Sequence, residues 1–234
     1  NVITLPETYN KVQDVAMIKK IVFTPPFIIY PKQNTRSGFF TESDENPLDY
    51  ITLNQSHFFC YPAKVGESLA FVYFHREFMN QGLSLCNLFE LATPEDYTNK
   101  KPDIIYVFGG RLNTKEKTTT FHIDKKNDIY FGYVNNCEEI DYFGYMKKML
   151  LTLHNVYMIR HHQLPIHGAM VNIVFNNDIE KNVVIIGDSG AGKSETLEAL
   201  RFIADDKIKE MNIVFDDMGV FYKRGSKIFA KGTE

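Results

Sequence analysis

The sequence predicts a mixed α/β fold in two parts, a mixed α+β N-terminal domain over residues 1–135 and an α/β core that begins at residue 136. Three observations predict it. In the stretch 182–204, a short run of apolar, β-branched residues leads into a glycine-rich loop and then into a helical pattern. Apolar residues recur every three or four positions over 138–161, which indicates one long helix. Strand-like runs separated by turn residues dominate the first part, and those at 118–134 predict a hairpin.

The glycine-rich loop matches the pattern GxxxxGK[ST] at every position. Val183–Ile186 precedes it and is predicted to be a buried strand of a parallel sheet. Backbone N–H groups of such a loop surround a phosphate; Lys193 would reach the β- and γ-phosphates from the protein surface, and the Ser194 hydroxyl would bind Mg²⁺. The sequence therefore predicts a P-loop nucleotide-binding core that takes ATP or GTP with Mg²⁺. Its predicted cofactor-binding residues are Gly187, Asp188, Ser189, Gly190, Ala191, Gly192, Lys193, Ser194 and Glu195.

Two adjacent carboxylates follow the next apolar run. Met211 to Phe215 is predicted to be a short strand that ends at Asp216-Asp217. In P-loop folds, an aspartate at the end of a neighbouring strand holds the Mg²⁺ that bridges the nucleotide phosphates, and a second aspartate can serve as a base or hold water. The alternative is an Asp-rich turn without a chemical role. The position after a strand favours the functional interpretation.

Two further residues are ambiguous from their spacing. Lys148 lies off the apolar stripe of the long helix, where most charged residues are simply solvated. His167 opens the predicted strand 166–175, which a turn at 176–178 joins to the strand before the P-loop. A single histidine in a strand is more often a hydrogen-bonded core residue than a metal ligand.

Composition limits the partners. The chain has 26 basic and 29 acidic residues in 234, so no basic field favours nucleic acid. No apolar run reaches the ~18 residues that a membrane-spanning helix needs, and the N-terminal stretch lacks the pattern of a signal peptide. Its cysteines, Cys60, Cys86 and Cys137, have no metal-binding spacing and are expected to be reduced. We therefore expect a cytoplasmic protein with a small-molecule partner, and neither nucleic acid nor membrane.

The motifs resemble two related families. GDSGAGKSE, from Gly187 to Glu195, is similar to the P-loop of HPr kinase/phosphorylase, and His167 and the Asp pair fit the same family. Both features also occur in ATP-dependent phosphoenolpyruvate carboxykinase, where the resemblance extends further upstream. The segment YFGYMKK, from Tyr142 to Lys148, resembles that family's Tyr-x-Gly-Glu-Met-Lys-Lys segment, and the 19 residues from Lys148 to His167 equal the family's own interval. The resemblance covers 142–234.

This resemblance implies a carboxykinase-like P-loop fold and assigns roles. Lys148, His167 and Asp217 would be Mn²⁺ ligands, and Ser194 would bind the nucleotide Mg²⁺. The implied catalytic residues are Lys193, Asp216 and Tyr142, the last as a contact to the carboxylate substrate. The implied enzyme is a lyase and phosphotransferase that decarboxylates oxaloacetate and phosphorylates the enolate to phosphoenolpyruvate. The alternatives are an HPr-kinase-like protein serine kinase/phosphorylase and a nucleotide-binding regulatory module without turnover.

The chain also departs from the carboxykinase pattern. Tyr145 replaces a glutamate, Ser194-Glu195 replaces two threonines, and Asp217 lies further beyond the P-loop than in carboxykinases. Arg36, in Thr35-Arg36-Ser37, is weakly similar to the family's substrate-arginine segment and is not among the predicted site residues. The chain stops at Glu234, before the family's arginine finger and adenine pocket. We expect a truncated polypeptide that is inactive unless its missing C-terminal part, as a partner, supplies them.

Overall fold

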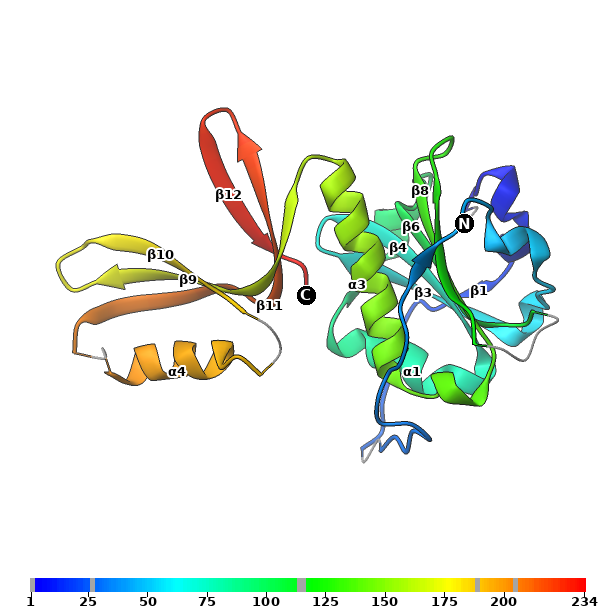
Figure 1. Ribbon diagram of the computed structural model, residues 1–234, viewed down its shortest axis with the longest axis horizontal. Coiled ribbons are helices and arrows are strands. Elements are labelled where there is room, and N and C mark those ends of the chain that lie inside the picture. Colours follow the sequence, from blue (N-terminus) through cyan, green and yellow to red (C-terminus); the bar gives the residue numbers. More distant parts are fainter. Residues whose placement is uncertain (1–2, 26–27, 113–116, 188–189, 204–205) are drawn as a thin grey trace. The chain divides into compact units, whose positions relative to one another are not determined.

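A computed structural model describes residues 3–25, 28–112, 117–187, 190–203 and 206–234. The chain forms two compact units, Asn1–Tyr157 and Met158–Glu234, and each is described by itself (Figure 1). The sequence places its boundary at 135/136, before the long helix, whereas the structural division falls near the end of that helix. The reason is that the helix packs on the sheet of the first unit. The fold is mixed α/β, as predicted.

The first unit is built on an eight-stranded mixed sheet with the strand order β1-β3-β4-β6-β8-β7-β2, and β5 pairs with β3. Its strands are β1 (Ala16–Met17), β2 (Thr41–Glu42), β3 (Phe58–Val65), β4 (Ser68–His75), β5 (Glu90–Leu91), β6 (Ile104–Gly110), β7 (Thr119–Asp124) and β8 (Ile129–Asn135). β4, β6 and β8 are parallel neighbours, so their carboxyl ends lie at one edge of the sheet. β7 and β8 form the antiparallel hairpin that the sequence predicts.

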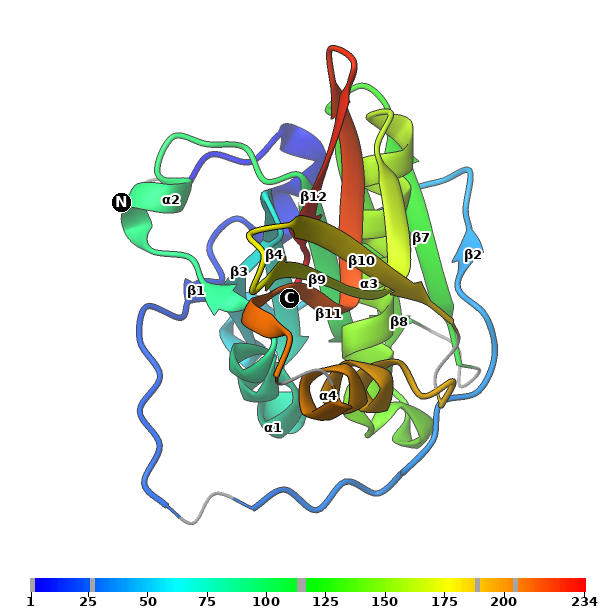
Figure 2. The ribbon, with the colours of Figure 1, turned by 90° about the vertical axis from the view of Figure 1, so that its left-hand side faces the viewer.

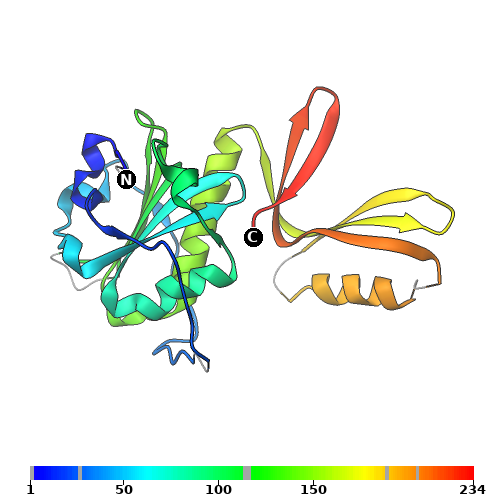
Figure 3. The same cartoon turned by 180° about the vertical axis from the view of Figure 1, so that it is seen from behind.

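Helices and loops cover both faces of this sheet. The α-helices are α1 (Met79–Ser84), α2 (Pro94–Tyr97) and α3 (Phe143–Arg160), and the 3-10 turns are η1 (Glu7–Val12), η2 (Pro47–Tyr50), η3 (Gln55–His57), η4 (Arg76–Phe78), η5 (Leu85–Asn87) and η6 (Glu138–Ile140). α3 lies over the sheet in Figure 1 and behind it in Figure 3. Its Leu153 packs so closely on Gly132 of β8 that a Cβ there would lie 2.7 Å from a Leu153 methyl. The other face packs against Tyr9 and Val12 of η1 and Leu48 of η2 in one apolar cluster.

The second unit is a four-stranded antiparallel sheet with one helix. Its order is β10-β9-β11-β12, and its elements are β9 (Leu164–Phe175), β10 (Glu180–Ile186), α4 (Lys193–Ile203), β11 (Ile208–Arg224) and β12 (Lys227–Gly232). Figure 2 shows α4 along one side of the sheet. Leu197 of α4 joins Ala169, Val171 and Ile173 of β9 in a small core. This unit provides the framework of the P-loop.

Two sequence predictions about these strands are wrong. The strand before the P-loop was predicted to be parallel and buried, but β10 pairs antiparallel with β9 alone at the edge of the sheet. Val184 and Ile186 are 36% and 66% exposed there. The run at 211–215 was predicted to end before the Asp pair. Instead β11 continues through both aspartates, because it pairs with β9 and then also with β12.

Candidate functional site

The P-loop lies between β10 and α4, as its sequence predicts. Gly190 and Gly192 have φ angles of 81° and 79°, a region that glycine adopts without steric cost. A Cβ at either position would meet no heavy atom within 4 Å, so the backbone angle and not crowding requires glycine. Of the predicted loop residues, Asp188 and Ser189 lie outside the described part of the chain. The others connect the end of β10 to the first turn of α4.

Lys193 begins α4 and is buried. Its exposed fraction is 8%, although the sequence was interpreted as placing this lysine at the surface. The same turn carries Ser194 and Glu195, which are exposed, and the carbonyl oxygen of Gly192 accepts hydrogen bonds from the N–H and the hydroxyl of Thr196. The lysine aliphatic chain therefore contributes to packing, and a truncation at this position would leave a gap.

The Asp pair is positioned by its neighbours in β11. Phe215, immediately before the pair, is buried, and its ring occupies the space that a Cβ at Gly219 would need. A bulge between Ile213 and Phe215 shifts the pairing of β11 with β9 just before the aspartates. Asp217 then has a φ of 76°, an angle that costs a non-glycine residue of the order of 1–3 kcal/mol. Strain of this kind persists only where the surrounding structure enforces it, and it is often found at functional sites.

The two aspartates contact different partners. The Ser194 hydroxyl lies 3.3 and 3.4 Å from the two carboxylate oxygens of Asp216. The Nε2 atom of His167 lies 3.0 Å from Oδ1 of Asp217, and these two side chains are 31% and 37% exposed. The pairing of β9 with β11 places His167 diagonally opposite Asp217, next to Gly168. The structure thus brings four of the predicted site residues together as two pairs.

Three of these four residues, Ser194, Asp216 and Asp217, line one cavity. It has a volume of about 420 Å³, and its lining includes the P-loop, the start of α4 and both aspartates. The lining residues are Gly190, Gly192, Lys193, Ser194, Glu195, Asp216, Asp217 and Glu234. A cavity of this size falls within the range of small-molecule sites, which is roughly 300–1,000 Å³.

Gly168 keeps the histidine strand close to β10. A Cβ at this position would lie 2.5 Å from the carbonyl oxygen of Ile185, so a larger residue would push the strands apart. Ala169, the next residue, is fully buried against α4. His167 pairs with Met218 of β11, and the pairing of β9 with β10 begins at the next residue, Gly168.

Two predicted residues belong to the first unit. Lys148 is half-buried on α3, where its carbonyl oxygen accepts a hydrogen bond from Thr152. Tyr142 precedes α3, and its ring packs on Gly144 so tightly that a Cβ there would overlap it. Within the described residues, no group of three or more His, Cys, Asp or Glu side chains is arranged to hold a metal. The predicted metal ligands, one lysine, one serine, one histidine and one aspartate, include only two side chains of these four types.

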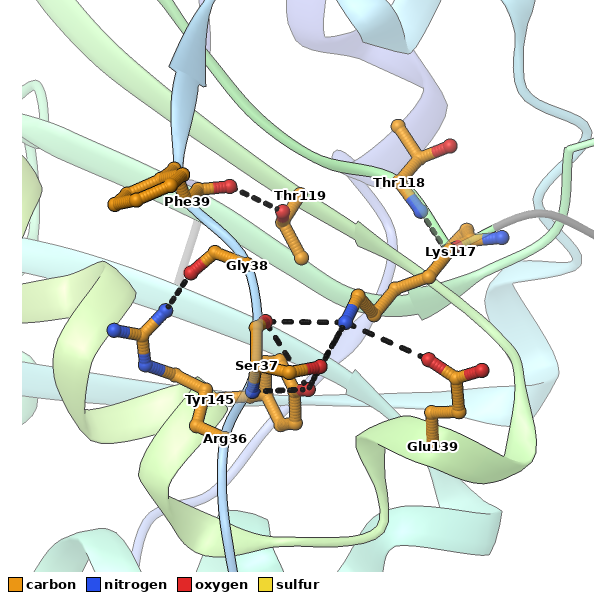
Figure 4. A network of polar contacts seen from close by, with 10 residues as sticks. Arg36, Ser37, Gly38, Phe39, Lys117, Thr118, Thr119, Glu139 and Tyr145 are labelled. Carbon is orange, nitrogen blue, oxygen red and sulfur yellow. Dashed lines mark hydrogen bonds and ion pairs between the residues drawn. The ribbon is translucent and has the colours of Figure 1, made fainter.

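Tyr145 lies where the carboxykinase segment that 142–148 resembles has a glutamate, and it organises a polar network (Figure 4). Its hydroxyl accepts a hydrogen bond from the Ser37 N–H at 3.0 Å and lies 3.3 Å from Nζ of Lys117. Lys117 also contacts the Ser37 hydroxyl at 2.6 Å and Glu139 at 3.5 Å. Burial acts to raise the pKa of Tyr145, but the hydrogen bonds from Ser37 and the contact with Lys117 outweigh it and lower the pKa below its usual value. The network anchors the segment with Arg36 to the start of α3.

Sequence reasoning missed this anchor. Arg36 itself folds back, with its guanidinium 4.8 Å from the Phe40 ring centre and a 2.7 Å hydrogen bond to the Gly38 carbonyl. The resemblance of Thr35-Arg36-Ser37 to the substrate-arginine segment was the available signal. No local pattern points to Lys117, which comes from the loop before β7.

Comparisons with known proteins found no matching family model and no matching curated protein. In the described part of the chain, no helix combines the length and the apolar character that crossing a membrane requires. The three cysteines are free thiols, and Cys60 is buried.

Proposed function

We propose that the chain belongs to a nucleotide-dependent enzyme resembling phosphoenolpyruvate carboxykinase, with oxaloacetate, ATP or GTP, Mg²⁺ and Mn²⁺ as its reactants and cofactors. In this reaction the C–C bond to the departing carboxylate of oxaloacetate breaks and releases CO₂. The electron pair forms an enolate, whose oxygen takes the γ-phosphoryl group and leaves a nucleoside diphosphate. A cytoplasmic location is part of the proposal, because free thiols are typical of that compartment.

One observation carries the proposal, the pairing of Ser194 with Asp216 and of His167 with Asp217 beside one P-loop. A P-loop alone serves many reactions, and an Asp pair alone is often a turn. Their combination provides two separate groups of metal-binding atoms, as a reaction with a nucleotide metal and a substrate metal would need. The two aspartates thereby have different roles in the proposal.

The first pair suits Mg²⁺. Two oxygen ligands of one Mg²⁺ ion at right angles, each ~2.1 Å from it, lie about 3 Å apart. The 3.3 Å between the Ser194 hydroxyl and Asp216 is close to this value, and hydroxyl and carboxylate oxygens are the ligands that Mg²⁺ prefers. Lys193, at the same helix end, would hold the β- and γ-phosphates as a point charge. When bound, Mg²⁺ would neutralise phosphate charge as the phosphoryl group leaves.

The second pair suits Mn²⁺. An imidazole nitrogen beside a carboxylate oxygen is a ligand combination that first-row transition metals bind more tightly than Mg²⁺ does. We infer that His167 and Asp217 supply two ligands. The resemblance implies Lys148 as a third ligand, in the form of a neutral amine, and Tyr142 as a contact to the substrate carboxylate. The contact with Ser194 assigns Asp216 to the nucleotide Mg²⁺, in place of the role as a base or water holder that the resemblance implies.

The runner-up is an HPr-kinase-like protein kinase. The observation that favours it is Tyr145, whose hydroxyl is bound to Ser37 and Lys117, so that it cannot replace the carboxylate of the carboxykinase segment. In this interpretation one residue of the Asp pair accepts the proton of a protein serine, and Lys148 has no role. A nucleotide-binding module without turnover is the third possibility.

A two-substrate assay separates the three. The full-length protein is incubated with Mn²⁺, Mg²⁺ and ATP or GTP, once with oxaloacetate and once with a serine-bearing acceptor protein. Phosphorus NMR detects phosphoenolpyruvate, and mass spectrometry detects phosphoserine. The carboxykinase proposal expects the first product and not the second. Nucleotide binding without either product would favour the module and contradict both enzymes.

Variants in the same assay identify the residues. Lys193→Met preserves most of the buried aliphatic packing and removes the charge, so it should abolish nucleotide binding by calorimetry without unfolding the protein. Lys227→Met, an exposed lysine on β12, is the matched control and should bind as the parent does. Lys148 is supported as a ligand if the Mn²⁺ affinity of the parent rises with pH, because an amine must lose its proton to bind a metal. The affinity of Lys148→Met should then be lower than that of the parent. Equal affinity in parent and Lys148→Met, with a loss in His167→Ala, would favour the protein kinase.

A further inference from the structure

A second cavity lies in the first unit and is not used by the proposed reaction. It has a volume of about 450 Å³ and is lined by residues from three chain segments. The first precedes β3, the second follows β4, and the third ends β6. β4 and β6 are adjacent and parallel, so the cavity lies at their carboxyl ends. In open α/β sheets, ligands bind preferentially at this edge.

Basic and imidazole groups gather in this cavity. Arg76, Arg111, His57 and His75 line it together with the polar side chains of Thr52 and Asn54. Arg76 forms no salt bridge with any residue that the structure describes. Arg111 lies 3.8 Å from Glu77, in an exposed pair that contributes little to stability. The guanidinium groups are therefore available to a ligand, and two cations face one carboxylate.

His75 is held in one orientation. It is buried, its ring packs edge-on against Phe58 at 5.2 Å and against His57 at 5.7 Å, and its Nδ1 accepts the N–H of Glu77 at 3.3 Å. Oε2 of Glu77 lies 3.4 Å from the same nitrogen, but burial lowers the pKa of His75 and keeps the ring neutral. A neutral ring whose Nδ1 is an acceptor carries its proton on Nε2, so His75 offers a donor there.

Glu77 is also fixed. Its Oε2 accepts a hydrogen bond from Asn136 at 2.8 Å, and that contact, with smaller contributions from the neighbouring cations, lowers its pKa. Asn136 follows β8, so the third parallel strand contributes to the same edge. The carboxylate is thus ionised at neutral pH and remains an acceptor for a hydroxyl or an amine.

A glycine keeps the floor of the cavity open. Gly109 has a φ of 80°, and a Cβ there would lie 2.7 Å from the Phe78 ring and 3.1 Å from the Cβ of His75. A side chain at this position would displace both. The backbone therefore passes close to the Phe78 ring and the Cβ of His75, in a conformation that suits glycine.

We propose that this cavity binds a small organic anion, through a carboxylate or phosphate group held by Arg76 and Arg111, with a hydroxyl or amine donated to Glu77. Guanidinium groups bind both oxyanions in a bidentate manner, and His75 and Asn54 add neutral donors. The cavity volume of about 450 Å³ is larger than a carboxylate or phosphate group, so the rest of a small organic molecule also fits. The proposal does not depend on the P-loop or on the carboxykinase reaction.

Titration by two-dimensional ¹⁵N–¹H NMR tests it. The probes are inorganic phosphate, glycerol 3-phosphate and succinate at constant ionic strength, with glycerol as the neutral control. They are added to the Lys193→Met protein, so that phosphate binding at the P-loop does not contribute. We expect saturable shifts of the Gly109 and Arg111 amides with at least one anion and none with glycerol. Phosphate and succinate distinguish a phosphate ligand from a carboxylate.

Variants locate the site. Arg76→Gln and Arg111→Gln should each lower the affinity for the anion that gave saturable shifts about tenfold or more, because each removes charge-assisted hydrogen bonds. Arg160→Gln, the same change at an exposed position on α3, should change affinity by less than about twofold. Arg111 has only the exposed pair with Glu77, and Arg76 has no salt bridge among the described residues. Both variants should therefore remain folded and keep the parent's NMR spectrum outside the cavity. The proposal is overturned if no probe gives saturable shifts in the parent, or if the arginine variants bind as tightly as Arg160→Gln.

Discussion

The two sheets of this chain are covered very differently. In the first unit every residue of β6 and β8 is buried, because α3 covers one face and the turns η1 and η2 cover the other. In the described part of the second unit, α4 is the one helix, and Leu197 is its single buried apolar side chain in the core. β10, which leads into the P-loop, is exposed along most of its length. Stability is concentrated in the first unit, and the strained, charged site lies in the second.

The units also use carboxylates in opposite ways. In the first unit, Asp96 accepts a hydrogen bond from the Thr93 N–H at the start of α2, where it completes a capping box. In the second, Asp217 has an unfavourable backbone angle beside His167. One carboxylate stabilises its surroundings, whereas the other is held in place by them. The strained backbone at Asp217 supports the metal-binding role that we propose for it.

The largest expected effect is in the first core. Phe131→Ala removes a fully buried ring from β8 and should lower the free energy of unfolding by about 3–5 kcal/mol. The chain has no tryptophan, and Tyr222 is the one tyrosine outside the first unit, so tyrosine fluorescence in urea follows that unit. Leu197→Ala should leave this transition nearly unchanged. If both variants shifted it equally, the two units would unfold as one.

A smaller effect is expected at the strand that carries His167. Gly168→Ala forces a methyl group against the Ile185 carbonyl oxygen and should destabilise the second unit by about 1–3 kcal/mol. Amide hydrogen exchange should rise in β9 and β10 and stay unchanged in β6 and β8. Gly225→Ala is the control: its turn has a positive φ, but an added Cβ would meet no atom within 4 Å. It measures the cost of the backbone angle in the absence of crowding. Gly168, unlike Gly225, has no positive φ, so a Gly168→Ala protein as stable as the parent would show that the Ile185 contact does not limit this position.

The third prediction concerns the strain itself. Asp217→Gly relieves the positive φ but removes the hydrogen bond to His167, so stability should change by less than about 1 kcal/mol in either direction. Mn²⁺ affinity, measured by calorimetry, should nevertheless fall at least about tenfold. Asp216→Gly has no strain to relieve and should destabilise the strand by about 0.5–1 kcal/mol. Unchanged Mn²⁺ affinity in Asp217→Gly would remove Asp217 from the proposed metal site.

The smallest effect is a pH dependence in the first unit. The Thr93 backbone hydrogen bond, followed by the contact with Lys64, lowers the pKa of Asp96 to about 2. A carboxylate with a lowered pKa in the folded state stabilises the protein above its unfolded pKa of ~3.9, and that contribution is lost as the pH falls towards 2. The stability difference between the parent and Asp96→Asn should therefore be present at pH 6 and shrink between pH 4 and pH 2. Glu67→Gln, at an exposed turn, is the control. A difference that stayed constant across this range would contradict the lowered pKa.

The elements of the candidate site were largely predictable, but their pairing was not. The glycine-rich loop, its helix and the strand of His167 follow from local patterns that the structure confirms. The direction of β10 was predicted wrongly, although a signal existed. A tight turn at 176–178 joins β9 to β10, and two strands joined by so short a turn must be antiparallel. The parallel interpretation followed the apolar run and neglected the turn.

Other features depend on contacts that no local pattern encodes. The contact of Ser194 with Asp216 and that of His167 with Asp217 require the register of β9 against β11, including a bulge. The positive φ of Asp217 follows from the same irregular pairing. Lys117 and Ser37 reach Tyr145 from positions 28 and 108 residues away in sequence. Such long-range contacts are set by the whole sheet, so a reading of short segments does not find them.

The angles of Gly190 and Gly192 have a consequence for ligand affinity. Both residues have positive φ, a region in which a side chain is strained, and both line the cavity beside Lys193. Glycine holds these angles without that strain and lets a ligand approach the backbone closely. Alanine at either position would have to bear the strain or leave the angle, and the cost of restoring the angle would subtract from the binding free energy of an anion.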